Sequence, residues 1–218
     1  MSCAARARSV PVSRALEIPD RALKPPPAYP NMTIGLLGGT FDPPHAAHMH
    51  ISEVALKRLG LDRLWWLVTP GNPLKSRSDA ATFASRFSNA QKLATHPLIN
   101  VTAFEASLGS AYTADMLAFL IRRFSGTRFI WVMGADNLVS FHRWKHWRDI
   151  LDTVPVAVID RPGYRYAARA GLAAQCFAGT YIDESDARGL HRHHPPAWTL
   201  LSAPLMDLSS TKLRAITG

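Results

Sequence analysis

The residues with the clearest chemical potential lie between Gly38 and His48, in the stretch GGTFDPPHAAH. Gly38 and Gly39 follow a short apolar run, and glycine lets a phosphate group approach the backbone amides closely. Two prolines then force a turn, because proline fixes its own φ and restricts the residue before it. His45 and His48 come next. Their spacing of three residues places both imidazoles on one face of a helix that begins near His45.

The start of such a helix is suited to holding a polyphosphate. Its first turn has backbone N–H groups with no partner inside the helix, and it carries a partial positive charge. Imidazole donors beside those groups would add to the same anion site. Two alternatives stay open: His45 caps the helix while His48 packs against a sheet, or the pair belongs to a zinc site, for which no third ligand has a telling position.

The elements that must position these residues alternate along the chain. Apolar segments of strand length begin near residues 33, 63, 98, 128, 154 and 198, and segments with helical spacing of apolar residues lie at 48–61, 82–97, 112–124, 135–144 and 146–154. This alternation predicts a single doubly wound, Rossmann-like α/β domain, with a parallel sheet covered by helices on both faces. Ligands of such a sheet bind beyond the carboxyl ends of the strands, where strand order reverses.

Composition limits the class of protein. The chain has 218 residues, 47% of them hydrophobic, so it can bury a core of its own. A formal charge of +9 favours an anionic partner, such as nucleic acid, a membrane surface or a phosphorylated substrate, without choosing among them. Two cysteines, Cys3 and Cys176, form no paired framework, and no apolar run has the length of a membrane span. We expect a cytoplasmic protein.

Two segments have little regular pattern. Residues 1–31 lack hydrophobic periodicity and end in the proline cluster LKPPPAYPN. We expect them to be a disordered basic extension that activity does not need, with residues 32–218 as the folded domain. An over-long start, with Met32 as the true initiator, is an alternative. Residues 164–196 are alanine-rich and include HRHHPP, which we interpret as a solvated loop because consecutive histidines cannot all face one site.

The GGTFDPPHAAH stretch resembles the G-G-T-F-D-P-x-H-x-G-H signature of the nucleotidyltransferase superfamily, which is also related to the class I aminoacyl-tRNA synthetases. Near the other end, LSSTKLR is similar to the second motif of that superfamily, I-S-S-T-x-I-R. Between them, TPGNPLK, YTADML, GADNLVSFHRW and RPGY follow the order found in bacterial nicotinate mononucleotide adenylyltransferases. The resemblance covers about residues 33–216. It departs at Ala47, where the family usually has glycine, and at Leu208, where it has isoleucine.

The resemblance implies that the chain transfers the adenylyl group of ATP to nicotinate mononucleotide and releases pyrophosphate. Mg²⁺ would arrive with ATP, and no covalent enzyme intermediate is needed, so catalysis would depend on alignment and charge stabilisation. By the same resemblance, the residues that contact the phosphates or the nucleotide are Gly38, Gly39, Thr40, Phe41, His45, His48, Lys75, Ser209, Ser210, Thr211 and Arg214. Plainer interpretations are a capped surface helix at 208–214 and a solvated side chain at Lys75.

For the second substrate the resemblance implies contacts from Thr113, Asp136 and Trp144, whose indole could stack on a pyridine ring. Alternatively, Asp136 caps the helix after the fourth strand and Trp144 belongs to the core or to a lid. Arg86 is expected to be a structural or surface cation. The other functions considered are a pantetheine-phosphate adenylyltransferase and a nucleotide-binding sensor without turnover. We expect no nucleic-acid or membrane partner, and the pattern does not show whether the chain forms a homo-oligomer.

Overall fold

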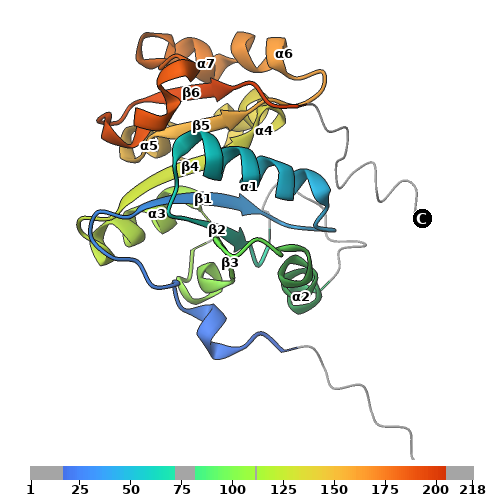
Figure 1. Ribbon diagram of the computed structural model, residues 1–218. Helices are drawn as coiled ribbons and strands as arrows, with labels where there is room; N and C mark the ends of the chain where they lie inside the picture. The colour runs from blue at the N-terminus through green and yellow to red at the C-terminus, as the bar shows by residue number, and fades with distance from the viewer. Residues whose placement is uncertain (1–16, 72–81, 111, 205–218) are drawn as a thin grey trace, which may run out of the picture.

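Six parallel strands form one sheet in the computed structural model, which describes residues 17–71, 82–110 and 112–204 (Figure 1). The strands are β1 (Thr33–Gly39), β2 (Arg63–Val68), β3 (Ile99–Thr102), β4 (Arg128–Gly134), β5 (Val156–Ile159) and β6 (Trp198–Leu201). Their order across the sheet is β3-β2-β1-β4-β5-β6, and every pairing is parallel. This order, in which the chain winds outward in both directions from β1, confirms the predicted doubly wound α/β fold.

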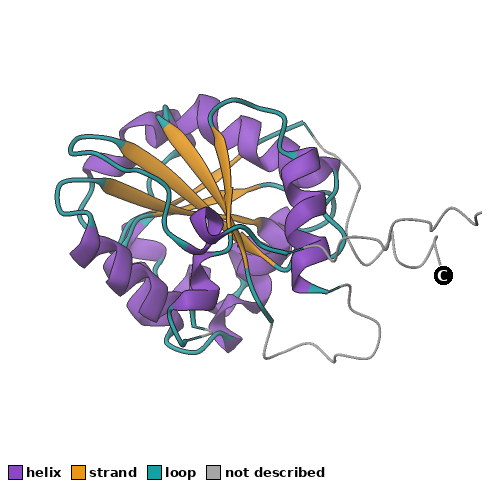
Figure 2. Ribbon diagram, turned by 90° about the horizontal axis from the view of Figure 1, so that it is seen from below, coloured by secondary structure: helices purple, strands orange, loops and turns teal. Residues whose placement is uncertain are grey.

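Helices cover both faces of the sheet, as Figure 2 shows from a second direction. The α-helices are α1 (Ala46–Leu59), α2 (Phe83–Leu93), α3 (Thr113–Arg123), α4 (Ala135–Ser140), α5 (Trp147–Thr153), α6 (Arg165–Ala170) and α7 (Leu172–Cys176). The 3₁₀ helices are η1 (Asp20–Leu23), η2 (Phe104–Ser107), η3 (Phe141–Arg143), η4 (Ala178–Thr180) and η5 (Glu184–Arg192). The cluster on one face draws on α1, α2 and η5, and the cluster on the other draws on α3, α4, α5, α6 and α7.

The strands are continuous apolar runs because both of their faces are buried. Trp65 and Trp66 are neighbours in β2, yet they belong to opposite core clusters, since successive side chains of a strand point to opposite faces. Both indoles are fully buried. Continuous rather than alternating hydrophobicity is therefore what the sequence of a doubly covered sheet must show.

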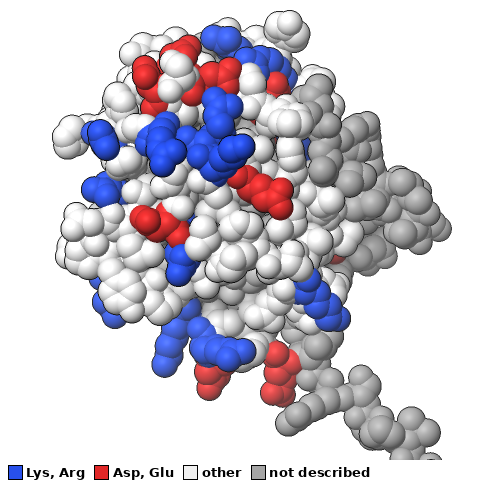
Figure 3. All heavy atoms as spheres, viewed as in Figure 1, with Lys and Arg blue, Asp and Glu red and all other residues white. Residues whose placement is uncertain are grey.

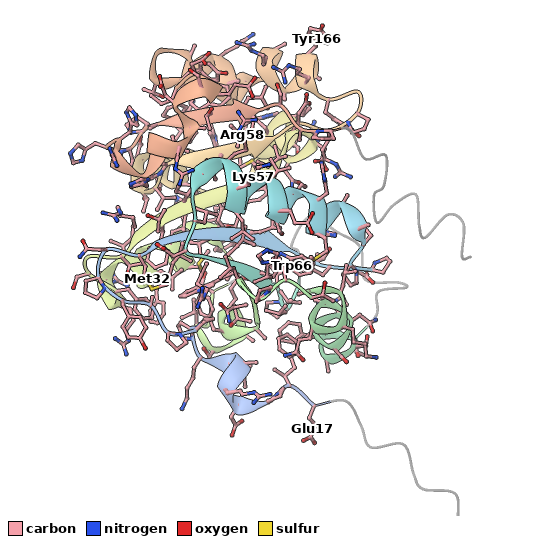
Figure 4. All side chains as sticks on the ribbon, in the orientation of Figure 1. Glu17, Met32, Lys57, Arg58, Trp66 and Tyr166 are labelled. Carbon is pink, nitrogen blue, oxygen red and sulfur yellow. The ribbon has the colours of Figure 1, made fainter. Side chains whose placement is uncertain are left out.

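The chain reverses its direction of winding between β1 and β4. After β1 it continues through α1 to β2 on one side, and β4 adds to the other side of β1. The connections that leave the carboxyl ends of these two neighbouring strands therefore diverge, and a crevice opens between them in folds of this kind. Met32 marks the amino edge of the sheet in Figure 4, and Trp66 lies toward the carboxyl edge.

Residues 17–31 differ from the predicted disordered extension. They run beside β3 and η2 (Figure 1), and Ala22 within them is buried. The carbonyl of Ala22 accepts hydrogen bonds from the backbone N–H of Ala103 at 2.9 Å and from the hydroxyl of Thr102 at 3.1 Å. Prolines remove donors but keep their carbonyls, so a proline-rich segment can still be anchored by acceptors such as these. Residues 1–16 lie outside the described residues.

The poorly patterned segment 164–196 consists of short elements. Its α-helices have five or six residues, and its longest element, η5, is a 3₁₀ helix, so no 3.6-residue period could develop. His191 lies in η5 and is half-buried, whereas His193 and His194 are exposed, so the solvated loop predicted for HRHHPP is confirmed only at its end. In the part of the chain that the structure describes, no helix is long and apolar enough to cross a membrane.

Candidate active site

The connection after β1 is held in an unusual backbone conformation. Phe41 has a φ of +49°, in the left-handed region that residues with a Cβ rarely adopt. Its ring is buried and stacks on Trp66 with centroids 5.0 Å apart, and it also contacts the ring of His48 at 4.7 Å. Packing therefore enforces the strained turn that leads into α1.

The glycines at the end of β1 are explained in part by packing. A Cβ on Gly38 would lie 2.5 Å from an indole carbon of Trp131, and a Cβ on Gly39 would lie 3.3 Å from the ring of Phe41. Close approach of these two aromatic rings requires small residues here whether or not a nucleotide binds. The nucleotide contact predicted for both glycines is an additional role that remains a proposal.

His48 is fixed in the first turn of α1. Its Nδ1 accepts a hydrogen bond from the backbone N–H of His45 at 3.2 Å, so a neutral imidazole carries its proton on Nε2. The carbonyl of His48 accepts a hydrogen bond from the Ser52 hydroxyl, which in turn accepts one from the indole N–H of Trp66, both at 2.7 Å. The orientation and the tautomer of His48 are thus determined by its surroundings.

His45 is the residue that caps the N-terminus of α1, and it is almost completely buried. Its ring lies 4.0 Å from that of His48 between centroids. Burial, reinforced by the positive charge of Arg161 and opposed by Asp136, lowers the pKa of His45 from 6.5 to about 4. The His45 side chain and the backbone N–H of His48 face each other in a capping box, as the alternative of a helix cap expected, but the buried Nδ1 of His45 forms no full hydrogen bond among the described residues. His45 is therefore neutral at pH 7, with a polar atom that the described protein does not satisfy.

Asp136 comes to the site from the end of β4, the strand next to β1 at which the winding of the chain reverses. It lies in the first turn of α4, directly after β4, and its Oδ2 accepts a hydrogen bond from Nη1 of Arg161 at 2.9 Å. The N-cap of α4 is Gly134, so Asp136 does not cap this helix as the structural alternative expected. Its Oδ1 is buried without a hydrogen-bond partner among the described residues.

Gly134 and Arg161 are site residues to which the sequence assigned no role. A Cβ on Gly134 would lie 2.4 Å from Oδ1 of Asp136 and 2.9 Å from Cδ of Arg161, so this glycine makes room for the ion pair. Arg161 follows β5 and reaches a carboxylate 25 positions earlier in the chain. Its position in the RPGY motif was the available signal, but motif order alone does not reveal which carboxylate it meets.

The remaining predicted residues are only partly described. Thr113 is the first residue of α3, which follows β3. Trp144 follows η3 and is half-buried, with edge-on contacts to Phe141 at 5.2 Å and to Trp131 at 6.2 Å between centroids. The predicted phosphate contacts that lie outside the described residues are Lys75, Ser209, Ser210, Thr211 and Arg214. The structure therefore brings together His45, His48 and Asp136.

Charge on the face seen in Figure 3 is mixed, with Lys and Arg beside Asp and Glu. Arg58 of α1 pairs with Glu184 at 3.3 Å, and Arg165 of α6 pairs with Asp160 at 3.0 Å. Both arginines are partly exposed. These two arginines are therefore offset by neighbouring carboxylates.

A doubly wound sheet with a helix N-terminus, two imidazoles and a carboxylate beside the point where strand order reverses is an arrangement typical of nucleotide-binding α/β proteins. The model of the cytidylyltransferase-like family matches residues 36–216. The chain therefore belongs to this family, and curated relatives of high identity are named probable nicotinate-nucleotide adenylyltransferase.

Three of these relatives, each named probable nicotinate-nucleotide adenylyltransferase, are more than half identical to the chain. The protein of Cereibacter sphaeroides is 53% identical over 184 residues, which cover 84% of this chain and 97% of the relative. The protein of Agrobacterium fabrum is 53% identical over 183 residues, covering 84% and 98%. The protein of Methylorubrum extorquens is 54% identical over 183 residues, covering 84% and 99%.

Solved structures with a similar fold include the nicotinic acid mononucleotide adenylyltransferase of Plasmodium falciparum. The complex of that enzyme with APC has a TM-score of 0.62 at 16% identity, and its complex with NaAD has a TM-score of 0.59 at 18% identity. Each covers 85% of this chain and 83% of that chain. At this level of identity the likeness supports the fold.

Proposed function

We propose that the chain transfers the adenylyl group of ATP to nicotinate mononucleotide, giving deamido-NAD and pyrophosphate. The observation that carries this proposal is the identity of more than half of the aligned residues with proteins named for this activity, over nearly their whole length. The names of the relatives favour this function over a pantetheine-phosphate adenylyltransferase and over a sensor without turnover. The site at the switch point supplies the matching chemistry.

The reaction needs alignment more than it needs a reactive side chain. A phosphate oxygen of nicotinate mononucleotide forms a bond to the α-phosphorus of ATP, and the bond from that phosphorus to the oxygen bridging to the β-phosphorus breaks. Pyrophosphate leaves with the electron pair of that bond. Negative charge grows on the phosphate oxygens, so donors placed beside them lower the barrier.

His45 and His48 are the proposed donors to the phosphates of ATP. His48 has its proton on Nε2 because Nδ1 is occupied by the N–H of His45, and it lies in the first turn of α1, where the helix N-terminus attracts anions. His45 is neutral at pH 7, and its buried Nδ1 still lacks a partner among the described residues. A neutral imidazole donates a hydrogen bond without giving up its proton, which fits a step that transfers no proton from the enzyme.

Asp136, Thr113 and Trp144 are the proposed contacts to nicotinate mononucleotide. Arg161 holds Asp136 in place, and this leaves Oδ1 of Asp136 to accept from a substrate hydroxyl. Two aromatic rings of the core support the edge of Trp144, so its indole is a firm platform for a pyridine ring. Lys75, Ser209, Ser210, Thr211 and Arg214 are proposed on the resemblance alone, with Arg214 holding the departing pyrophosphate.

Mg²⁺ is proposed to enter bound to ATP, where it would offset the negative charge of the triphosphate. Among the described residues, no group of three or more His, Cys, Asp and Glu side chains is placed to hold a metal ion. The described contribution of the chain to this step is therefore the pair of imidazoles and the helix N-terminus. We place the reaction in the cytoplasm, in keeping with the absence of a paired cysteine framework from the sequence.

A panel of acceptors tests the proposed function. The purified chain is incubated with ATP and Mg²⁺ and with nicotinate mononucleotide, nicotinamide mononucleotide or phosphopantetheine in separate reactions, and pyrophosphate is measured. We expect the fastest release with nicotinate mononucleotide. Release with phosphopantetheine alone would assign the chain to the other adenylyltransferase, and ATP binding without release from any acceptor would make it a sensor.

A further inference from the structure

A buried arginine of α2 binds both of the connections that leave β1 and β2. Arg86 is only 5% exposed, although the sequence suggested nothing more than a structural or surface cation. Its guanidinium donates from Nη1 to the carbonyls of Thr40 and Thr69, the latter at 2.9 Å, and from Nη2 to the carbonyl of Pro70 at 3.1 Å. A single side chain thus joins two loops at the carboxyl edge of the sheet.

The first of these carbonyls is in the loop that leads to the imidazoles. Thr40 directly precedes Phe41, whose left-handed φ of +49° turns the chain toward His45. The carbonyls of Thr69 and Pro70 are in the connection after β2, and the N–H of Thr69 donates to the carbonyl of Gly39 at 3.0 Å, which continues the β1–β2 pairing past the strand ends. Arg86 therefore fixes the direction of the Thr40 carbonyl against the start of the connection after β2.

The geometry of arginine suits this role better than that of lysine. The planar guanidinium presents several N–H groups in a rigid fork, and here it meets three carbonyls from two segments. The Phe83 ring lies 5.4 Å from its central carbon. Burial lowers the pKa of Arg86, and the nearby Asp42 carboxylate opposes this shift. The side chain is therefore held from several sides, and the three hydrogen bonds named above all go to backbone carbonyls of the two loops.

We propose that Arg86 is a positioning residue for ATP, acting through the Thr40 carbonyl to hold the Thr40–His45 loop in the conformation that binds the triphosphate. This inference rests on the proposed function, because it assigns the loop to ATP. Arg86 touches no reacting atom in this account. Loss of its fork leaves the loop free to shift, and shifts of about 1 Å at a reacting centre reduce rates by up to about 10²-fold.

Arg86→Lys is the principal variant, with Arg128→Lys as the matched control. Arg128 also donates to a backbone carbonyl, that of Asn31, but at the amino edge of the sheet. For Arg86→Lys we expect kcat/KM for ATP to fall between tenfold and 10²-fold, with KM for nicotinate mononucleotide at saturating ATP within about twofold of the parent. Arg128→Lys should keep both constants while its thermal midpoint falls, as circular dichroism will show.

A second variant, Phe83→Leu, weakens the hold on the guanidinium without removing it. We expect KM for ATP to rise a few-fold, so that kcat/KM for ATP falls as it does in Arg86→Lys, while the circular dichroism spectrum stays that of the folded chain. This variant keeps the inference testable if Arg86→Lys does not fold. Guanidinium ions added to Arg86→Ala should restore part of the lost rate.

Unchanged ATP kinetics in folded Arg86→Lys or in Phe83→Leu, or equal losses for both substrates, would overturn the inference. Failure of the parent chain to adenylylate nicotinate mononucleotide would instead refute the proposed function.

Discussion

The two edges of the sheet satisfy their polar groups differently. At the amino edge, the N–H of Thr33 donates to Asp62 at 2.7 Å, the N–H of Asp62 returns a bond to the carbonyl of Thr33 at 2.9 Å, and Arg128 bonds both the Thr33 hydroxyl and the carbonyl of Asn31. At the carboxyl edge, buried atoms of His45 and Asp136 have no hydrogen-bond partner among the described residues.

The contrast holds for these residues and not for every polar atom of either edge, because His191, near Arg128 and Asp62, also has a buried Nδ1 without a partner among the described residues. A buried polar atom without a partner costs about 1–3 kcal/mol. Such atoms also occur in the core, at Trp65, Trp131 and Thr199, so those of His45 and Asp136 stand out by lying together beside the ends of β1 and β4.

The carboxyl edge also has the crowded Gly134, whereas a left-handed non-glycine residue occurs at both edges, Phe41 at the carboxyl edge and Asn31 at the amino edge. The amino edge therefore should respond to mutation in stability, and the carboxyl edge in turnover.

The largest effect is expected at His48. His48→Ala removes a donor to the phosphates and should lower kcat about 10²-fold or more, in line with the loss of one transition-state donor. His96→Ala is the matched control, because Nδ1 of His96 also accepts a backbone N–H, that of Leu98 at 3.2 Å, but before β3 at the amino edge. Steady-state pyrophosphate release measures both, and similar rates for the two variants would remove the contrast between the edges.

A smaller loss is expected from Gly134→Ala. The added methyl group would meet Oδ1 of Asp136 at 2.4 Å and Cδ of Arg161 at 2.9 Å, so the ion pair must move. We expect kcat/KM for nicotinate mononucleotide to fall roughly tenfold and the free energy of unfolding to drop by about 1–3 kcal/mol. Gly179→Ala is the control, since a Cβ there meets nothing within 4 Å. Parent-like kinetics in Gly134→Ala would separate Asp136 from substrate binding.

Deletion of residues 1–31 should affect stability more than turnover. It removes the carbonyl that accepts from Ala103 and Thr102, together with the carbonyl of Asn31 that accepts from Arg128. We expect a loss of about 1–3 kcal/mol in the free energy of unfolding, with kcat within about twofold at 25 °C. Deletion of residues 1–16 leaves those contacts in place and serves as the control. Denaturant titration distinguishes them, and equal stability of the two truncated chains would contradict the anchoring of residues 17–31.

The mildest perturbation changes a proton equilibrium. The pKa of His45 is about 4, chiefly through burial and then through Arg161, while Asp136 raises it. Arg161→Met should therefore raise this pKa toward 6.5, and Asp136→Asn should lower it, as an NMR titration of the imidazole will show. Since the folded-state pKa lies below 6.5, the stability that His45 contributes is present above pH 6.5 and is lost as the pH falls toward 4. A pKa near 6.5 in the parent chain would mean that the imidazole is solvated.

The fold was predictable because its strands are continuous apolar runs bounded by polar or turn-forming residues. The starts assigned to the first and fourth strands, near residues 33 and 128, match the observed strands Thr33–Gly39 and Arg128–Gly134. The short elements of residues 164–196 were not predictable, because 3₁₀ turns and five-residue helices develop no period. The anchoring of Ala22 also escaped prediction, since a single carbonyl that meets β3 and η2 has no local signature.

In the site, too, local features could be predicted from the sequence and long-range contacts could not. The pattern of glycine, proline and histidine placed His45 and His48 together at a helix start, because those contacts are local. The pairing of Asp136 with Arg161 joins the ends of two strands, and the burial of Arg86 depends on carbonyls 16 to 46 positions away. Contacts of this range follow from the strand order, which propensity alone does not provide.

The central claim is that the triphosphate of ATP binds at the start of α1, between the ends of β1 and β4. A crystal structure of the chain with a non-hydrolysable ATP analogue and nicotinate mononucleotide tests it most directly. The account predicts a phosphate oxygen within hydrogen-bond distance of Nε2 of His48, with the mononucleotide beside Asp136. A nucleotide bound elsewhere on the molecule, or phosphates that avoid both histidines, would contradict it.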